Sequence, residues 1–174
     1  MNVYLNESAY LHNLASEIER ANFWGATYGL TYFPTLIKES VLGYDAKFDK
    51  IGKPLFIQTK IPEYLTKSDS KEWGYFKQSY YRFSLYPDNK SHQHNLLVNL
   101  GMKFKNSVFY VAPIFHDDQT FSKHVINSKI IENSKFINTT RLPQITGNEK
   151  HVICYAKGTK SKMWSNEITV EDSF

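Results

Sequence analysis

Residues 44–61 read YDAKFDKIGKPLFIQTKI, and this stretch decides the fold of the chain. The run 44–48 alternates aromatic and polar residues, and the run 55–61 is rich in the β-branched and aromatic residues that favour strands. Between the two runs, DKIGKP supplies turn residues, and Pro62 closes the second run. We therefore predict a β-hairpin in which residues 44–48 pair with residues 55–61.

The predicted hairpin gathers three polar side chains, those of Asp45, Gln58 and Lys60, at one end of a sheet. Because side chains alternate along a strand, Gln58 and Lys60 share one face while Thr59 takes the other. A tight turn brings Asp45 beside that polar pair. One interpretation is an exposed face on which Asp45 and Lys60 form an ion pair worth less than about 1 kcal/mol. The apolar residues that closely flank the polar ones favour instead a partly buried site.

Helical and strand patterns continue on both sides of the hairpin. We predict an amphipathic helix over 6–22, a loop over 23–34, a short helical turn over 35–42, a strand over 80–86, a second helix over 91–104 with Ser91 as its N-cap, a buried strand over 108–115, a third helix over 120–131, and short strands near 135–139 and 151–156. The order helix, hairpin, helix, strand predicts an α/β or α+β fold.

Length and composition limit the classes of protein that fit this sequence. The 174 residues suit one domain spanning 1–174, and the formal net charge of +4 mildly favours a polyanionic partner. The single cysteine, Cys154, excludes an internal disulfide and any multi-cysteine zinc site. The longest apolar run, 108–115, is far shorter than the roughly 18 residues of a membrane span, and the N-terminus lacks signal-peptide features. We expect a cytoplasmic protein with no membrane partner.

Two further function classes are excluded by absent motifs. The sequence contains no G-x-S-x-G element of a serine hydrolase and no glycine-rich phosphate loop of the P-loop or dinucleotide-binding type. Cys154 lies in an apolar run, where a small buried hydrophobic residue is expected rather than a nucleophile. The hairpin therefore carries the strongest chemical signal in the sequence.

The pattern Asp45, Gln58-Thr59-Lys60 between two predicted helices resembles the PD-(D/E)XK nuclease superfamily, specifically its Mrr-like variants in which glutamine replaces the acid before X-Lys. The resemblance covers about residues 11–115, its motif is short, and Tyr44 stands where the family usually has proline. The implied fold is a restriction-endonuclease-like core, with a mixed central sheet flanked by helices. The implied element order is helix, three-stranded meander, helix, strand.

The resemblance implies a metal-dependent endonuclease that hydrolyses phosphodiester bonds in DNA, in restriction and defence or in repair. Asp45 would bind Mg²⁺ or Mn²⁺, Gln58 would add its side-chain oxygen, and Lys60 would orient or activate the attacking water. Such ions prefer oxygen ligands and lower the pKa of a bound water. Two alternatives stay open: a catalytically weak relative that binds nucleic acid or a partner protein, and a structural β-rich interaction module in which the motif is accidental.

A neutral Gln58 leaves a metal ion in need of another carboxylate. Glu39, shortly before the hairpin, is the first candidate for both the catalytic and the metal site. Glu17 on the first helix, where relatives often place an acid, is the second candidate, and Glu19 is the third. The alternative for each is a solvated surface acid.

Candidate contacts to nucleic acid lie in two places. Gln93 and His94 stand at the N-terminus of the second helix, where free amides and the helix dipole favour a phosphate. Arg82 and Lys67 belong to a basic region interleaved with aromatic residues that could contact phosphates and stack bases. The alternative is ordinary surface lysines over an aromatic core. A homodimer is one assembly that the resemblance allows.

Overall fold

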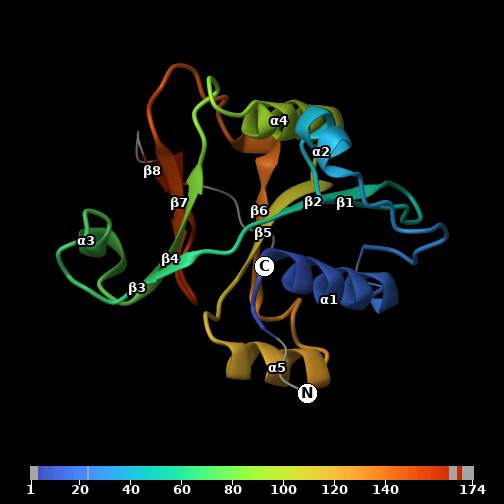
Figure 1. The fold of residues 1–174 in the computed structure, drawn as a ribbon, viewed down its shortest axis with the longest axis horizontal. Helices are drawn as coiled ribbons and strands as arrows, with labels where there is room; N and C mark the ends of the chain where they lie inside the picture. Colours follow the sequence, from blue (N-terminus) through green and yellow to red (C-terminus); the bar gives the residue numbers. More distant parts are fainter. Residues whose placement is uncertain (1–3, 23, 165–167, 170–174) are drawn as a thin grey trace.

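A computed structural model of the chain describes residues 4–22, 24–164 and 168–169, and it shows an α+β fold (Figure 1). The elements in chain order are α1 (Glu7–Arg20), α2 (Leu36–Leu42), β1 (Ala46–Phe48), β2 (Leu55–Thr59), β3 (Glu63–Leu65), α3 (Trp73–Phe76), β4 (Tyr80–Leu85), α4 (Gln93–Lys103), β5 (Val108–Pro113), α5 (Asp118–Ile126), β6 (Ser134–Asn138), the 3₁₀ helix η1 (Thr139–Arg141), β7 (His151–Tyr155), β8 (Lys162–Trp164) and β9 (Ile168–Thr169).

The first sheet contains four strands in the order β1-β2-β5-β6. Strands β1 and β2 pair antiparallel with Ala46 opposite Ile57, which confirms the predicted hairpin. Strand β5 lies parallel to β2 and antiparallel to β6, so the sheet is mixed. Outside β1, isolated bridges from Thr27 and Tyr32 attach the segment 27–32 to the edge of the sheet. The predicted loop over 23–34 therefore includes an irregular edge segment.

The second sheet is antiparallel, with the order β3-β4-β7-β8-β9. Its strands β4 and β7 match the strands predicted over 80–86 and near 151–156. The sequence did not predict that they form a separate sheet. Within the described part of the chain, the next two strands after β2, which are β3 and β4, belong to the second sheet, so a third meander strand can only precede β1, along the segment 27–32.

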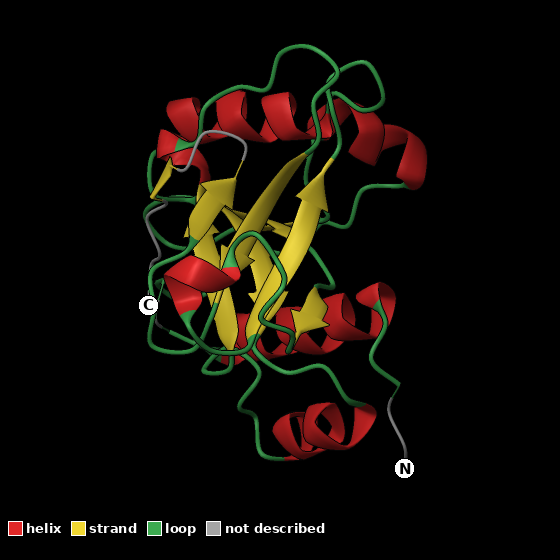
Figure 2. Ribbon diagram, turned by 90° about the vertical axis from the view of Figure 1, so that its left-hand side faces the viewer, coloured by secondary structure: helices red, strands yellow, loops and turns green. Residues whose placement is uncertain are grey.

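Helices cover both faces of the first sheet: α1 lies on one face and α4 on the other (Figures 1 and 2). The alternation along β2 explains this arrangement. Ile57 packs in a cluster with Leu14 and Ile18 of α1, whereas Phe56 packs in a cluster with Leu97 of α4. Because both faces are covered, all five residues of β2 are buried.

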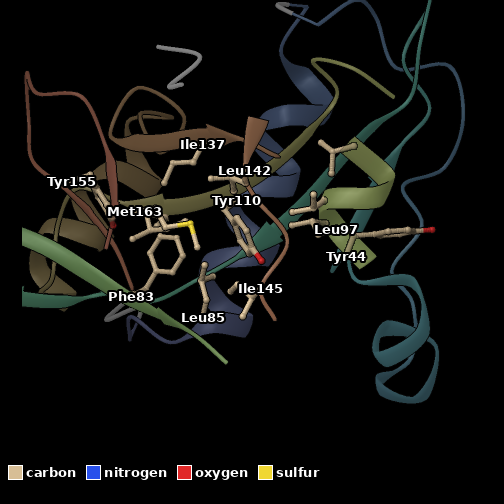
Figure 3. Packing of buried hydrophobic residues seen from close by; sticks show 14 of the residues in the cluster. Tyr44, Phe83, Leu85, Leu97, Tyr110, Ile137, Leu142, Ile145, Tyr155 and Met163 are labelled. Atoms are coloured by element: carbon tan, nitrogen blue, oxygen red, sulfur yellow. The ribbon is translucent and has the colours of Figure 1, made fainter. Parts of the chain in front are cut away.

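The cluster on the α4 side also joins the two sheets. Phe83 of β4 and Tyr155 of β7 pack in the same cluster as Tyr110 of β5 and Ile137 of β6 (Figure 3). The hydroxyl of Tyr155 donates to the carbonyl oxygen of Pro113 at 2.7 Å, which ties the second sheet to β5. This shared core holds the second sheet against the first sheet, near the end at which β2 and β5 terminate.

Helix ends follow the capping residues. Asn6 caps α1 and Asp117 caps α5 through side-chain oxygens that accept backbone N–H groups. The predicted N-cap Ser91 is wrong by one residue, since His92 holds that position and Ser91 Oγ accepts from the Gln93 N–H. The third helix ends at Ile126 rather than 131 because its C-cap is followed by a residue with positive φ.

Two sequence-based exclusions can be compared with the structure. Among the described residues, no helix is both long and apolar enough to span a membrane. Cys154 is fully buried, and burial raises the pKa of its thiol far above the usual value. A thiol that stays protonated in the core is not a nucleophile.

Candidate active site

The predicted polar residues lie where β1 begins and β2 ends. The Asp45 N–H donates to the Ile57 carbonyl at 2.9 Å, which places Asp45 opposite Gln58 across the hairpin. The Lys60 N–H donates to the Val111 carbonyl at 3.0 Å, so the parallel pairing of β2 with β5 continues to this residue. Asp45 and Gln58 are buried, whereas Lys60 is half-buried. The backbone thus holds all three residues at one end of the first sheet.

Gln93 at the start of α4 connects the polar side chains. Its Nε2 donates to Gln58 Oε1 at 3.2 Å and to Glu39 Oε1 at 3.1 Å. Its Oε1 accepts from Lys60 Nζ at 3.1 Å. These partners determine the orientation of the amide, because only the nitrogen can donate to two oxygens. The structure therefore brings Gln58, Lys60, Glu39 and Gln93 together from α2, β2 and α4.

Asp45 is held rigidly beside this network. Its Oδ2 accepts from the Thr59 N–H at 2.7 Å and from Thr59 Oγ1 at 2.6 Å. The Glu39 carboxyl lies near enough to Asp45 for a protonated Glu39 to donate to it. Thr59, which alternation placed on the opposite face, thus fixes the carboxylate through its backbone and hydroxyl. One Asp45 oxygen is committed to Thr59, and the carboxylate as a whole borders Glu39.

The acids of the site, Asp45, Glu39 and Glu7, lie around one positively charged side chain, that of Lys60. Burial first, and then the charge of Asp45 and the hydrogen bond to it, raise the pKa of Glu39 to about 7, with Lys60 acting in the opposite direction. Burial also raises the pKa of Glu7. The charge of Lys60 acts to lower this pKa, and the charge of Asp45 acts to raise it. Glu7 retains an exposed surface, yet neighbouring protein atoms surround much of its carboxyl. Three acids therefore face a single ammonium group.

Glu7 is the residue of this cluster that sequence reasoning missed. It stands at the first position of α1, where its charge suits the helix dipole, and that favourable local role concealed a second one. The sequence signal that could have identified Glu7 is its position at the start of α1. The start of α1, rather than its middle, lies near the strand end that carries Lys60.

The predicted acids Glu17 and Glu19 do not belong to the site. The Glu17 carboxylate accepts from the N–H groups of Ile130 and Ile131, at 2.8 and 3.2 Å. Glu19 accepts from the Thr31 hydroxyl. Both stand at least ten residues beyond Glu7 on α1, which at 1.5 Å per residue is about 15 Å along the helix. The structure therefore does not bring Glu17 to the predicted metal site.

His94 does not present its ring to a ligand either. The residue is 3% exposed, its Nδ1 is 3.0 Å from the Tyr110 hydroxyl, and its Nε2 is 2.9 Å from the Pro143 carbonyl. Burial lowers the pKa of His94, which keeps the ring neutral. The structure therefore leaves neither ring nitrogen of His94 free for the predicted contact to nucleic acid.

The two basic candidates differ in position. Arg82 on β4 is half-buried and pairs with Glu63 at 3.1 Å and with Glu72 at 3.6 Å. Lys67 is exposed in the connection between β3 and α3. Arg82 lines an open hollow that Lys60 also lines, whereas Lys67 does not. The structure thus brings one of the two near the polar cluster.

That hollow, of about 300 Å³, opens beside the cluster between the first sheet and β4. Its lining includes Glu7, Lys60, Arg82, Ser84 and Tyr86. The last three of these alternate along one side of the β4 chain, so they share a face. The volume reaches the lower end of the range of ligand pockets. A substrate can therefore approach Lys60 from this side.

The donor chemistry suits a small, hard cation. Asp45, Glu39 and Gln58 offer carboxylate and amide oxygens, the ligand type that Mg²⁺ and Mn²⁺ prefer. A bound cation would relieve the repulsion that raises the pKa of Glu39. In residues 4–22, 24–164 and 168–169, no three His, Cys, Asp or Glu side chains are grouped so as to hold a metal ion by themselves. A cation here would need Gln58 and water as further ligands.

Comparison with known proteins finds no matching family model, no matching curated protein and no matching solved structure. Fold alone does not determine chemistry. The function of this protein therefore has to be inferred from the side chains that the fold gathers at the end of β2.

Proposed function

We propose that this protein is a metal-dependent nuclease that hydrolyses phosphodiester bonds in DNA, with a site of the PD-(D/E)XK type. The observation that carries the proposal is the convergence of Asp45, Gln58 and Lys60 on one end of the hairpin, with Glu39 and Gln93 joined to them. Metal-assisted hydrolysis of a phosphodiester uses positioned oxygen ligands for the ion and a positive group near the attacking water, and this cluster offers carboxyl and amide oxygens and the Lys60 ammonium.

The order of the elements supports the same proposal. When α2, which precedes β1, and the inserted β3, α3 and β4, which lie between β2 and α4, are left out, the remaining elements α1, edge segment 27–32, β1, β2, α4 and β5 run as helix, meander, helix and strand. Strand β5 lies parallel to β2, and helices cover both faces of the mixed sheet. This is the order that the resemblance to the nuclease superfamily implies.

Each residue of the cluster has a definable task in such a site. Asp45 and Glu39 would hold the cation with the Gln58 oxygen, and the bound ion would polarise the phosphate and lower the pKa of its water. Gln93 orients Gln58 and Glu39 through its amide nitrogen. Lys60, at the edge of the hollow, donates to an oxygen of the incoming phosphate or of the attacking water and balances its negative charge.

The net charge of the chain, formally +4, favours a polyanionic substrate. Within the hollow, Lys60 and Arg82 stand beside the acids Glu7 and Glu63, so this support comes from the charge of the whole chain. We place the activity in the cytoplasm, in restriction, defence or repair. The reducing environment there agrees with the single buried cysteine.

A second candidate is a module of the same fold that binds nucleic acid or a partner protein without cleaving it. The observation that favours it is that the proposed metal-binding oxygens already accept hydrogen bonds from other residues of the protein. The Gln58 oxygen accepts from Gln93, and one Asp45 oxygen accepts twice from Thr59. A neutral glutamine whose oxygen already has a protein partner is a weaker metal ligand than a free carboxylate.

Cleavage of supercoiled plasmid DNA in Mg²⁺ or Mn²⁺, compared with EDTA, tests the proposal. We expect nicking or linearisation that Asp45→Asn and Lys60→Ala abolish, and that Lys123→Ala on α5, an exposed lysine outside the cluster, retains. DNA binding that weakens steeply with salt but proceeds without cleavage would select the second candidate. A protein that neither binds nor cleaves DNA would reject both candidate functions.

A further inference from the structure

The segment 28–41 presents an unusually apolar surface to solvent. Leu30, Leu36 and Ile37 are 92%, 84% and 82% exposed. The apolar patch, as we name it, consists of Tyr28, Leu30, Phe33, Leu36, Ile37 and Val41. Isolated exposed hydrophobic residues are ordinary, but these six lie within fourteen consecutive residues, on the edge segment and on the helix that follows it.

Helix α2, which carries half of the apolar patch, has an inverted arrangement. A surface helix normally buries its apolar side and exposes its polar side, as α1 does with Leu14 and Ile18. Helix α2 has no buried residue, and it directs Glu39 toward Gln93 while Ile37 and Val41 face solvent. It stands beside α4 at the margin of the molecule (Figure 1). Among the described residues, Leu42 of this helix packs against the core, whereas Leu36, Ile37 and Val41 remain exposed.

Few contacts hold α2 in place. The Thr35 hydroxyl oxygen caps the N-terminus of α2 by accepting from the Lys38 N–H at 3.5 Å, and the Glu39 carboxyl accepts from Gln93 Nε2. Gly43 ends the helix in the left-handed conformation, close against Leu96 of α4. An element with so little buried surface belongs to the low-stability part of a structure unless a partner covers it.

We propose that the apolar patch is the interface of a homodimer, in which a second copy of this chain covers it with the same patch. Charge argues for this occupant. Between residues 28 and 41 the charged side chains are Lys38 and Glu39, and Glu39 binds Gln93. A nucleic acid would require several cations here, and a charged protein partner would require complementary charges. An uncharged apolar face is complementary to itself, as a two-fold interface must be.

The size of the apolar patch suits the same occupant. Burying one such side chain removes about 60–120 Å² of apolar surface from water. Six of them therefore bury about 360–720 Å² of the roughly 800 Å² per partner of a standard interface, and flanking polar residues supply the rest as its rim. The apolar patch can therefore form the centre of a stable dimer.

The dimer does not depend on the proposed nuclease activity, but it would affect the candidate site. Glu39 lies on the same short helix as Leu36, Ile37 and Val41. Burying their side chains against a second copy would hold α2 in position and, with it, the Glu39 carboxylate beside Gln93. Association would then complete the site in each copy.

Sedimentation velocity tests the proposal, with the full chain at about 1–200 µM in EDTA and without DNA. We expect a dimer whose dissociation constant rises at least about 100-fold in Leu36→Asp/Ile37→Asp, since two buried apolar side chains are lost. Ile126→Asp, which changes an equally exposed apolar residue on α5, should dimerise as the wild type does. Circular dichroism checks that each variant is folded.

Two results would overturn the homodimer. One is a wild-type chain that stays monomeric at the highest concentration, which would leave the apolar patch to a different protein. The other is a folded double variant that dimerises as tightly as the wild type. Because neither result involves DNA or metal, the dimer and the nuclease proposal succeed or fail separately.

Discussion

Gln93 is the residue on which the candidate site depends. Its one amide group accepts from Lys60 and donates to both Gln58 and Glu39, so it links α4 to β2 and to α2. Asp45 is fixed independently, by Thr59. At the residue scale the site therefore has two separate supports, and each can be tested without removing the other.

Gln93→Ala should lower the rate of DNA cleavage by about 10- to 100-fold, because a misplacement of about 1 Å is enough to cost that much. DNA affinity in EDTA should stay within about twofold, since the other phosphate-facing groups are intact. Asn99→Ala, on the exposed side of the same helix, is the matched control. Equal losses of rate and affinity in Gln93→Ala would instead make Gln93 a binding residue.

Glu39 should make the metal-free protein less stable as the pH rises. Its folded-state pKa of about 7 exceeds the usual 4.5, so the folded chain binds this proton more tightly than the unfolded chain. The stabilisation from that proton is full below about pH 4.5 and is lost as the pH rises toward 7. Urea unfolding of wild type and Glu39→Gln in EDTA measures it.

Glu39→Gln should match the wild type near pH 4 and exceed its stability near pH 8. The glutamine keeps an acceptor and a donor at this position but removes the charge that repels Asp45. A stability difference that is the same at every pH would show that Glu39 does not hold a raised pKa.

At the scale of elements, α4 carries both the site and the packing of the sheet. Gly101 in this helix lies against Thr139 of η1, so a Cβ at that position would overlap the Thr139 hydroxyl. That hydroxyl is fully buried and binds the carbonyls of Leu97 and Val108, at 3.5 and 3.0 Å, so it cannot move aside cheaply. The absence of a side chain here lets α4 approach the end of β6.

Gly101→Ala should therefore destabilise the protein by about 1–3 kcal/mol, through overpacking of a well-filled contact. Gly74→Ala in α3 is the control, since a Cβ there meets nothing within 4 Å. It should be neutral or stabilising by up to about 1 kcal/mol. Chemical denaturation of the three proteins measures both effects, and an unchanged midpoint for Gly101→Ala would refute the packing argument.

Some elements could be predicted from the sequence and others could not. The period of apolar residues in α1 and the alternation around Gln58 are local patterns, and they predicted the helix and the hairpin correctly. The pairing of Tyr81 with Tyr155 joins residues far apart in sequence, which no local pattern specifies. Strands of three residues such as β3 and β8 are also too short to show a period.

At the scale of the whole molecule, one hydrophobic cluster spans both sheets, so they should unfold together. Tyr155 is fully buried and hydrogen-bonded to the Pro113 carbonyl. The candidate site lies next to this junction, and its hollow is lined from both sheets. The position of the hollow could not be predicted from the sequence, because it depends on how the second sheet packs against the first.

Tyr155→Phe should destabilise the whole protein by about 1–2 kcal/mol, because it leaves the Pro113 carbonyl without this partner. Tyr86→Phe, at an exposed position, should change stability by less than about 0.5 kcal/mol. Tryptophan fluorescence and far-ultraviolet circular dichroism should report one coincident transition for both variants. Two separate transitions would show that the sheets unfold independently.

The most direct test of the account is the binding of Mn²⁺ to the chain alone at pH 8. The electron paramagnetic resonance signal of the free ion measures how much Mn²⁺ is bound. If Asp45, Glu39 and Gln58 form one cation site, the wild type binds one ion per chain. Asp45→Asn should then weaken that binding at least about tenfold, equivalent to about 1.4 kcal/mol. Asp69→Asn, an exposed carboxylate outside the site, should have no effect. A wild type that binds no Mn²⁺, or an Asp45→Asn chain that binds it equally well, would contradict the central claim.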